Sequence, residues 1–195
     1  LDLFEQLCGA RLLYNYVWPG GLSHDLPKNF LERTKEFLDY FEPRIEEYNQ
    51  LLTTNKIFIE RSADVGVMPL DVAINYGVTG PTLRASGTNY DLRKEEPYSI
   101  YDQFDFNVPV GEGLMGTVGD CWDRYYVRVL ELTESVRILR QAIAKIPRGD
   151  VHSALPKKIR PKVGEVYSRY ESARGDVGFY IKSDGKNIPT RVKMR

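Results

Sequence analysis

The amino-acid sequence predicts a mainly helical α+β fold with a small antiparallel β-meander toward its C-terminal end. Two segments, residues 27–52 and 120–146, carry apolar side chains at helical spacing. After residue 163 the apolar period changes to two, which is typical of strands. The 195 residues include 42% hydrophobic and 28% charged residues, so a folded core is expected rather than disorder.

The first third of the chain is predicted to form two helices. Apolar residues at positions 3, 4, 7 and 10 predict a first helix to about Tyr16, closed by Pro19-Gly20-Gly21. A second helix is expected to begin near Asp25 or Asn29 and to present an apolar stripe to about residue 52. Pro43 lies inside this stripe and should kink the helix or split it in two, because it removes a backbone donor.

Residues 53–119 are rich in Gly, Pro and Asn and are expected to be largely irregular. A short helix is predicted over Met68–Tyr76, with Gly77 as its C-terminal stop. Long irregular stretches in compact proteins usually carry function or form interfaces. This middle region is therefore a candidate for either role.

The helix over residues 120–146 is the strongest single signal. Asp120 is expected to cap it, and Lys145 and Arg148 lie near its end, as the helix dipole favours. Its apolar seam consists of Trp122, Tyr125, Val129, Leu132, Val136, Leu139, Ile143 and Ile146. We expect this seam to pack lengthwise on the 27–52 helix, which has a stripe of similar length.

Three strands are predicted after residue 163, at 164–171, 176–183 and 191–195, with turns at 172–175 and 183–187. We therefore divide the chain into a helical part, 1–150, with its irregular middle at 53–119, and a linker with a β-meander, 151–195. Because the sequence begins within a helical pattern and stops within a strand-like one, both parts are expected to belong to a fragment of one larger domain.

Composition excludes several classes of protein. Equal numbers of basic and acidic residues, 27 each, argue against a generally basic nucleic-acid binder. Two distant cysteines, Cys8 and Cys121, cannot build a disulfide framework or a Cys-rich metal site, and indicate an intracellular protein. With only His24 and His152 besides, no metal site is expected. The apolar runs are too short for a membrane span.

One string matches a dinucleotide-binding pattern. Residues 111–116 read Gly-Glu-Gly-Leu-Met-Gly and follow a strand-like stretch at 104–110. Pro109 interrupts that stretch, residues 117–119 delay the next helix, and no parallel strand follows promptly. We interpret the string as a flexible loop and expect no nicotinamide binding.

Two arginines are candidate site residues. Arg84 and Arg174 each lie among Gly, Ala and Ser, which leave room for a guanidinium to meet an anion. The alternative is that each caps carbonyl groups or pairs with a buried carboxylate, and the pattern alone favours that structural role. Cys8 and Cys121 are interpreted as small core residues.

Several longer strings resemble one family. They are GPTLRASGTNYDLR (80–93), PYSIY (97–101), GDCWDR (119–124) and ESARGDVGFY (171–180). These strings are similar to the D-type subunit of respiratory complex I, the NADH–quinone oxidoreductase. That family is in turn similar to the large subunit of [NiFe] hydrogenases. The resemblance implies that the chain is a fragment of the [NiFe]-hydrogenase large-subunit-like fold.

The resemblance also implies a function. Complex I passes electrons from NADH through FMN and iron–sulfur clusters on other subunits to quinone, coupled to proton or ion translocation. The expected partners are other complex I subunits, including the one with the terminal cluster and the membrane arm, at the cytoplasmic face of the bacterial inner membrane. No nucleic-acid partner is expected.

The resemblance implies roles for specific residues. Arg174 matches an arginine above the Ni–Fe centre of hydrogenases and is the first quinone-cavity candidate; Arg84 is the second. The family's quinone-headgroup His and Tyr lie outside these residues, so the fragment is expected to hold no catalytic residue, metal or cofactor and to be inactive alone. The alternatives are a membrane-bound [NiFe] hydrogenase large subunit and a purely structural helical scaffold.

Overall fold

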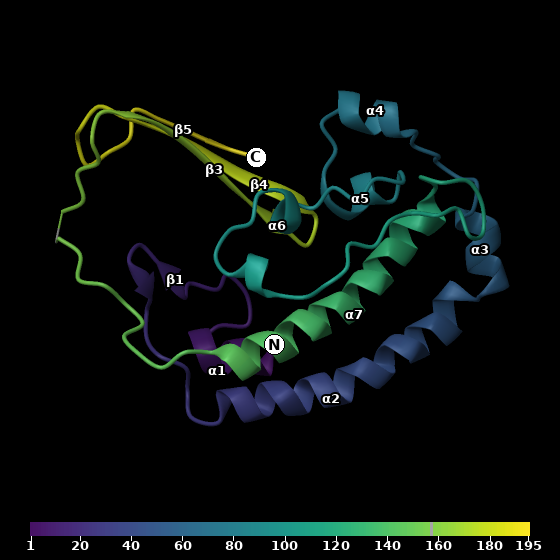
Figure 1. The fold of residues 1–195 in the computed structure, drawn as a ribbon, viewed down its shortest axis with the longest axis horizontal. Helices are drawn as coiled ribbons and strands as arrows, with labels where there is room; N and C mark the ends of the chain where they lie inside the picture. The colour runs from purple at the N-terminus through teal and green to yellow at the C-terminus, as the bar shows by residue number, and fades with distance from the viewer. Residues whose placement is uncertain (157) are drawn as a thin grey trace.

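The computed structural model describes residues 1–156 and 158–195 and confirms an α+β architecture (Figure 1). The N-terminal half contains α1 (Asp2–Cys8), β1 (Val17–Trp18), β2 (Gly21–Leu22), α2 (Phe30–Tyr48), a π-helical turn (Asn49–Thr53) and α3 (Lys56–Ser62). The remainder contains α4 (Leu70–Asn75), α5 (Gly80–Arg84), α6 (Leu92–Glu95), a 3-10 turn (Tyr101–Gln103), α7 (Cys121–Lys145), β3 (Gly164–Ser172), β4 (Gly175–Ser183) and β5 (Arg191–Met194).

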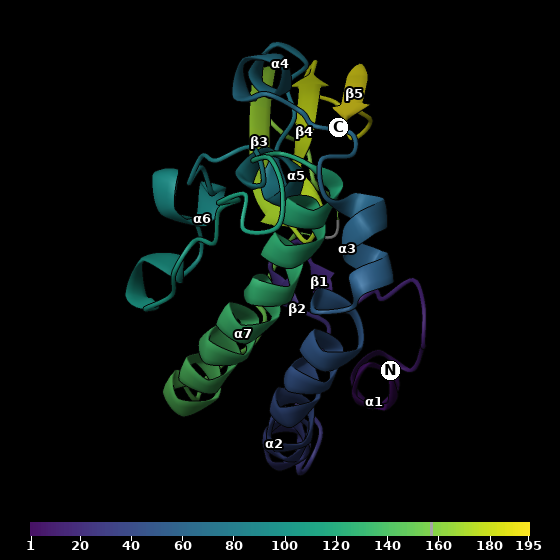
Figure 2. The ribbon, with the colours of Figure 1, turned by 90° about the vertical axis from the view of Figure 1, so that its right-hand side faces the viewer.

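The two long helices, α2 and α7, run side by side in both views (Figures 1 and 2), which confirms the predicted pairing. Leu38 and Ile45 of α2 are buried against Val129 and Val136 of α7. Leu132 packs at the margin of this cluster, whereas Leu139 is 42% exposed. The contact therefore includes most of the predicted positions and continues to Ile143, while Leu139 itself lies outside it.

Of the two outcomes predicted for Pro43, a kink or a split, the split does not occur. The helix begins after Asn29, as one of the two predicted starts, and continues through Pro43 to Tyr48. Leu38 before the proline and Ile45 after it both reach the α7 core. Packing on both sides offsets the single backbone hydrogen bond that proline removes. Arg140 of α7 adds ion pairs to Asp39 and Glu42, each at 2.8 Å.

The first helix is much shorter than predicted, because it ends at Cys8 rather than near Tyr16. Gly9 follows it in the left-handed conformation at φ 71°, which terminates a helix. The β1–β2 hairpin then forms around Pro19-Gly20. The segment at 151–153, expected to be linker, pairs with this hairpin through Leu22 N–Val151 O at 2.8 Å and Ser153 N–Gly20 O at 2.9 Å.

The irregular middle contains α4, which confirms the short helix predicted at 68–76, with Gly77 at positive φ after it. The strand-like residues 104–110 form no strand. Phe104 and Phe106 instead pack on Ile138 of α7. The backbone N–H of Asp105 donates to Gln141 Oε1 at 2.9 Å. Side chains of the helix thus replace the neighbouring strand that this stretch would otherwise need.

The C-terminal strands form the predicted antiparallel sheet, in the order β3–β4–β5. Ala173 and Arg174 make the turn of the β3–β4 hairpin, and Glu171 lies directly opposite Asp176. Helices α5 and α6 contact β4 and β3 respectively, which joins the sheet to the helical part (Figure 2). None of the helices in the described residues combines the length and hydropathy that a membrane span requires.

Candidate functional site

Arg84 lies at the end of α5 and is buried, with 1% of its surface exposed. Its guanidinium donates to Glu131 Oε1 from Nε at 2.9 Å and from Nη2 at 2.5 Å. Nη1 donates to Glu171 Oε1 at 3.0 Å and to the Tyr90 carbonyl at 3.2 Å. One side chain therefore joins α5 to α7, to β3 and to the loop before α6. This is the carboxylate-pairing role that the residue pattern favoured.

A second arginine extends this network. Asp91, which caps α6, accepts from Arg93 Nε at 3.0 Å and from Nη2 at 2.6 Å, and lies 3.5 Å from Arg84 Nη1. Burial alone would raise the pKa of Asp91, but the hydrogen bonds and charge of Arg93, together with Arg84, lower it overall. Asp91 therefore stays ionised between two guanidinium groups.

Glu171 has a different environment. Burial raises the pKa of this carboxyl, although Arg84 opposes the shift. Its backbone is held by Tyr98, whose hydroxyl accepts from Glu171 N at 3.1 Å and donates to Glu171 O at 3.3 Å. Burial also raises the pKa of Tyr98 to about 12, so this phenol remains a neutral donor.

Two cavities flank the network. The first, here called the Arg84 cavity, has a volume of about 430 Å³ and is lined by Arg84, Arg93, Glu131 and Glu171, with the turn residue Ala173 at its wall. Its walls are charged, so it suits a polar ligand or water rather than an apolar chain.

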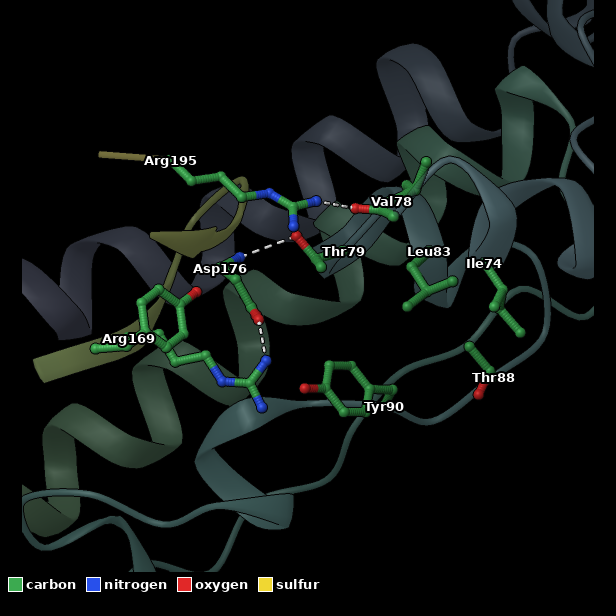
Figure 3. Close-up of a pocket in the computed structure, with 11 residues that line it drawn as sticks. Ile74, Val78, Thr79, Leu83, Thr88, Tyr90, Arg169, Asp176 and Arg195 are labelled. Carbon is green, nitrogen blue, oxygen red and sulfur yellow. Dashed lines mark hydrogen bonds and ion pairs between the residues drawn. The ribbon is translucent and has the colours of Figure 1, made fainter. Parts of the chain in front are cut away.

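The second, here called the Tyr90 cavity, has a volume of about 340 Å³ and lies between the α4–α5 segment and the sheet (Figure 3). Asp176 sits in its wall, where its backbone N–H donates to Thr79 Oγ1 at 3.0 Å and its carboxylate accepts from Arg169 at 3.0 Å. Burial raises the pKa of Tyr90, and the nearby Asp176 charge adds to this. Arg195 closes one side by donating to the carbonyl of Gly77.

Arg174 lies at the same corner of the molecule but is exposed at the hairpin turn. Gly80 packs directly against the backbone of this turn, because a Cβ at Gly80 would lie 2.4 Å from Gly175 Cα. The structure therefore brings the two sequence candidates near one hairpin, with Arg84 inside the network and Arg174 on the surface.

Comparison with known proteins identifies the group to which this architecture belongs. The family model described as respiratory-chain NADH dehydrogenase, 49 kDa subunit, matches residues 1–163 and 154–195. The chain belongs to this family. The resemblance seen in the sequence strings is thereby confirmed, and the small antiparallel sheet beside the long helices is consistent with a fragment of the 49 kDa subunit fold.

Individual relatives of the 49 kDa family are similar along the whole chain. The D-type NADH-quinone oxidoreductase subunit from Chlorobium phaeovibrioides is 53% identical over 199 residues, covering 100% of this chain and 50% of that protein. The corresponding subunit from Chlorobaculum tepidum is 51% identical with the same coverage. That from Cytophaga hutchinsonii is 51% identical over 99% of this chain and 51% of its own length. The chain thus spans about half the length of these relatives.

Other sequence candidates of this 49 kDa family member lie outside the network. The Gly111–Gly116 loop is anchored by Asp123, whose Oδ2 accepts from Gly113 N at 3.0 Å and from Gly119 N at 3.3 Å. Residues 104–110, which lead into this loop, form no strand, unlike the corresponding residues of dinucleotide-binding folds. His24 bonds to Ser23 and to the Leu7 carbonyl.

The two cysteines are unpaired within the described residues. Cys121 Sγ lies 2.9 Å from Arg124 Nη2, on the first turn of α7. The residues that sequence reasoning missed are the carboxylates around Arg84 and Arg169: Asp91, Glu131, Glu171 and Asp176. The available signal was the predicted turn at 172–175, which places 171 opposite 176.

Proposed function

We propose that this chain is part of the peripheral-arm, D-type subunit of an NADH–quinone oxidoreductase and helps to form its quinone-reduction cavity. The observation that carries the proposal is the 53% identity to such a subunit over the whole chain. In this role the parent enzyme moves electrons from NADH to quinone and couples the transfer to proton or ion translocation. Quinone is its substrate, and NADH, FMN and iron–sulfur clusters are bound by other subunits.

The proposed partners are the subunit that carries the terminal iron–sulfur cluster and the membrane arm. The proposed location is the cytoplasmic face of the bacterial inner membrane, held there through the complex. No group of three or more potential metal-ligating side chains gathers within the described residues. The donor set here is dominated instead by arginine–carboxylate pairs, which suits a role in shaping and charging a cavity wall.

We assign different roles to the two arginines within this proposal. Arg174 is exposed on the two-residue turn of the β3–β4 hairpin, and its guanidinium makes no hydrogen bond or ion pair with any described residue. It is therefore available to a polar headgroup. Arg84 is fully engaged by Glu131 and Glu171, so it is proposed to position the hairpin rather than to touch quinone.

The hydrogenase alternative receives no support from the relatives, whose names are those of NADH–quinone oxidoreductase subunits. The purely structural alternative applies if Arg174 has no effect on turnover. Loss of the buried Arg84 network should disturb folding whether the chain belongs to an enzyme or to a scaffold. The exposed Arg174 is therefore the residue that distinguishes the two alternatives.

The test is Arg174→Ala in the assembled enzyme. We expect normal assembly and normal NADH–ferricyanide reduction, which reports electron entry upstream, with reduced NADH–quinone turnover. Arg174→Lys should retain more turnover because it keeps the charge. Lys186→Ala, at the β4–β5 connection, is the matched control and should leave all three readouts unchanged. Unchanged quinone turnover in Arg174→Ala would refute the cavity role, and loss of assembly would make Arg174 a folding residue.

A further inference from the structure

Two buried carboxyl groups face each other across the β3–β4 hairpin. Glu171 and Asp176 are direct register partners, so their side chains lie on the same face of the sheet. Their side chains are only 3% and 7% exposed. The proposed role in quinone reduction assigns no function to either residue.

Each carboxylate has one oxygen on an arginine and one oxygen without a partner. Glu171 Oε1 accepts from Arg84 Nη1 at 3.0 Å, and Asp176 Oδ2 accepts from Arg169 Nη1 at 3.0 Å. The other two oxygens, Glu171 Oε2 and Asp176 Oδ1, are buried and have no hydrogen-bond donor among the described residues. Buried acceptors without a hydrogen bond are costly and rare in folded proteins. The two oxygens therefore need a donor, and neither carboxyl group can supply one while both are ionised.

The charge balance of the surrounding network points to the same need. Three guanidinium groups face four carboxyl groups in its buried or half-buried part. The former are Arg84, Arg93 and Arg169, and the latter are Asp91, Glu131, Glu171 and Asp176. If every carboxyl group were ionised, the network would carry one uncompensated negative charge. A single proton removes that charge.

The remaining groups that face the pair do not supply a donor. Tyr98 Oη bonds to the backbone of Glu171, Thr79 Oγ1 accepts from the backbone of Asp176, and Tyr90 lines the same cavity as Asp176. None of these hydroxyl groups makes a hydrogen bond to Glu171 Oε2 or Asp176 Oδ1. Glu96, which also binds Arg169, is 62% exposed and adds a further negative charge rather than a proton.

We propose that Glu171 and Asp176 form a proton-binding site that holds one proton between Oε2 and Oδ1. Glu171 is the donor and Asp176 the acceptor. Burial raises the pKa of Glu171 against the opposition of Arg84, and hydrogen bonding with Asp176 adds to the increase. The other oxygen of Asp176, Oδ2, keeps its ion pair with Arg169. One shared proton thus removes the repulsion between two like charges in a buried site.

The pair also borders both cavities. Glu171 lines the Arg84 cavity, and Asp176 lines the Tyr90 cavity. The proton can leave Glu171 for water in the Arg84 cavity when the side chain moves, and it returns by the same route, so exchange requires no other reactant. Deprotonation leaves two facing carboxylates, which places the proton occupancy of the site under the control of pH.

The test is acid–base difference infrared spectroscopy of the full-length protein carrying these residues, in its assembled state. We expect a protonated-carboxyl C=O band that shifts in D2O and disappears in both Glu171→Gln and Asp176→Asn. Each amide can donate the hydrogen bond that the proton supplies, so both variants should assemble. Glu165→Gln, on the same strand but 50% exposed and paired with Lys182, is the matched control and should keep the band.

Labelling the wild-type protein with ¹³C-carboxyl glutamate tests the site without a substitution. The band should then move to lower wavenumber, because Glu171 carries the proton. A band that persists unchanged in both amide variants, or one that does not move with glutamate labelling, would overturn the proposal. The assay reads a carboxyl group rather than turnover, so its outcome is independent of the quinone role of Arg174.

Discussion

Replacing Arg84 with alanine is expected to be the most damaging single charge change in this chain. The guanidinium makes four hydrogen bonds, to the carboxylates of Glu131 and Glu171 and to the Tyr90 carbonyl. All of these bonds are lost at once, and the Glu131 carboxylate, whose side chain is 18% exposed, loses the cation with which it pairs among the described residues. Removing one partner of a buried ion pair typically costs about 3–5 kcal/mol, and we expect Arg84→Ala to fall in that range.

Two comparisons make this expectation specific. Arg84→Lys keeps a charge, but a single ammonium cannot bridge both carboxylates with the geometry of a guanidinium, so an intermediate loss is expected. Arg174→Ala removes an exposed arginine and should change the free energy of unfolding by less than about 0.5 kcal/mol.

The assay is denaturant unfolding of the full-length protein and its variants at several pH values. The loss in Arg84→Ala should shrink as pH falls, because the stranded carboxylates then take up protons. A loss below about 1 kcal/mol at neutral pH, or one that grows on acidification, would refute the reasoning that Arg84 compensates buried negative charge.

Three further changes test the fold and the proton site. Leu38→Ala should cost about 2–5 kcal/mol because Leu38 is buried between α2 and α7, whereas Leu139→Ala, at an exposed position, should cost clearly less; equal losses would contradict the packing. Gly80→Ala should cost about 2–5 kcal/mol, because Gly80 has a φ of +68° and an added Cβ would also collide with the Gly175 backbone. Gly9 has a similar φ but no atom within 4 Å of an added Cβ, so Gly9→Ala should cost only the backbone strain of about 1–2 kcal/mol. For Glu171 the folded pKa lies above its ordinary value of 4.5, so its contribution to stability is complete below that value and is lost as pH rises through the folded pKa; unfolding measured against pH should lose this slope in Glu171→Gln, and an unchanged slope would contradict the raised pKa.

Elements with a strong periodic pattern could be predicted from the sequence alone. Helix α7 has both a continuous apolar seam and a capping Asp120, and the structure places its start at Cys121 as the cap requires. The β3–β4–β5 meander was predictable for a similar reason, because alternation and turn residues agree over 164–194. Local signals suffice where several of them coincide.

Other features depend on contacts between distant residues. The apolar spacing of residues 1–10 gives no sign that Gly9 turns left-handed, and the alternation at 104–110 reads as a strand although it packs along α7. The two carboxylates that accept hydrogen bonds from Arg84 are 47 and 87 residues away, on elements whose relative placement no local pattern specifies. The sequence could predict that Arg84 was either an anion site or a partner of buried carboxylates, but not which carboxylates.

The two arginines are mechanically connected through one hairpin. Arg84 binds Glu171, which lies on the strand leading into the Arg174 turn, and Gly80 in the same helix α5 contacts the backbone at Arg174 and Gly175. A change at Arg84 should therefore move the turn and affect quinone turnover through position, whereas a change at Arg174 should affect turnover with the hairpin in place. If this connection holds, Arg84→Lys lowers both stability and quinone reduction, and Arg174→Ala lowers only quinone reduction. Reduced turnover without lost stability in Arg84→Lys would mean that Arg84 itself acts on the substrate, against the burial and pairing seen here.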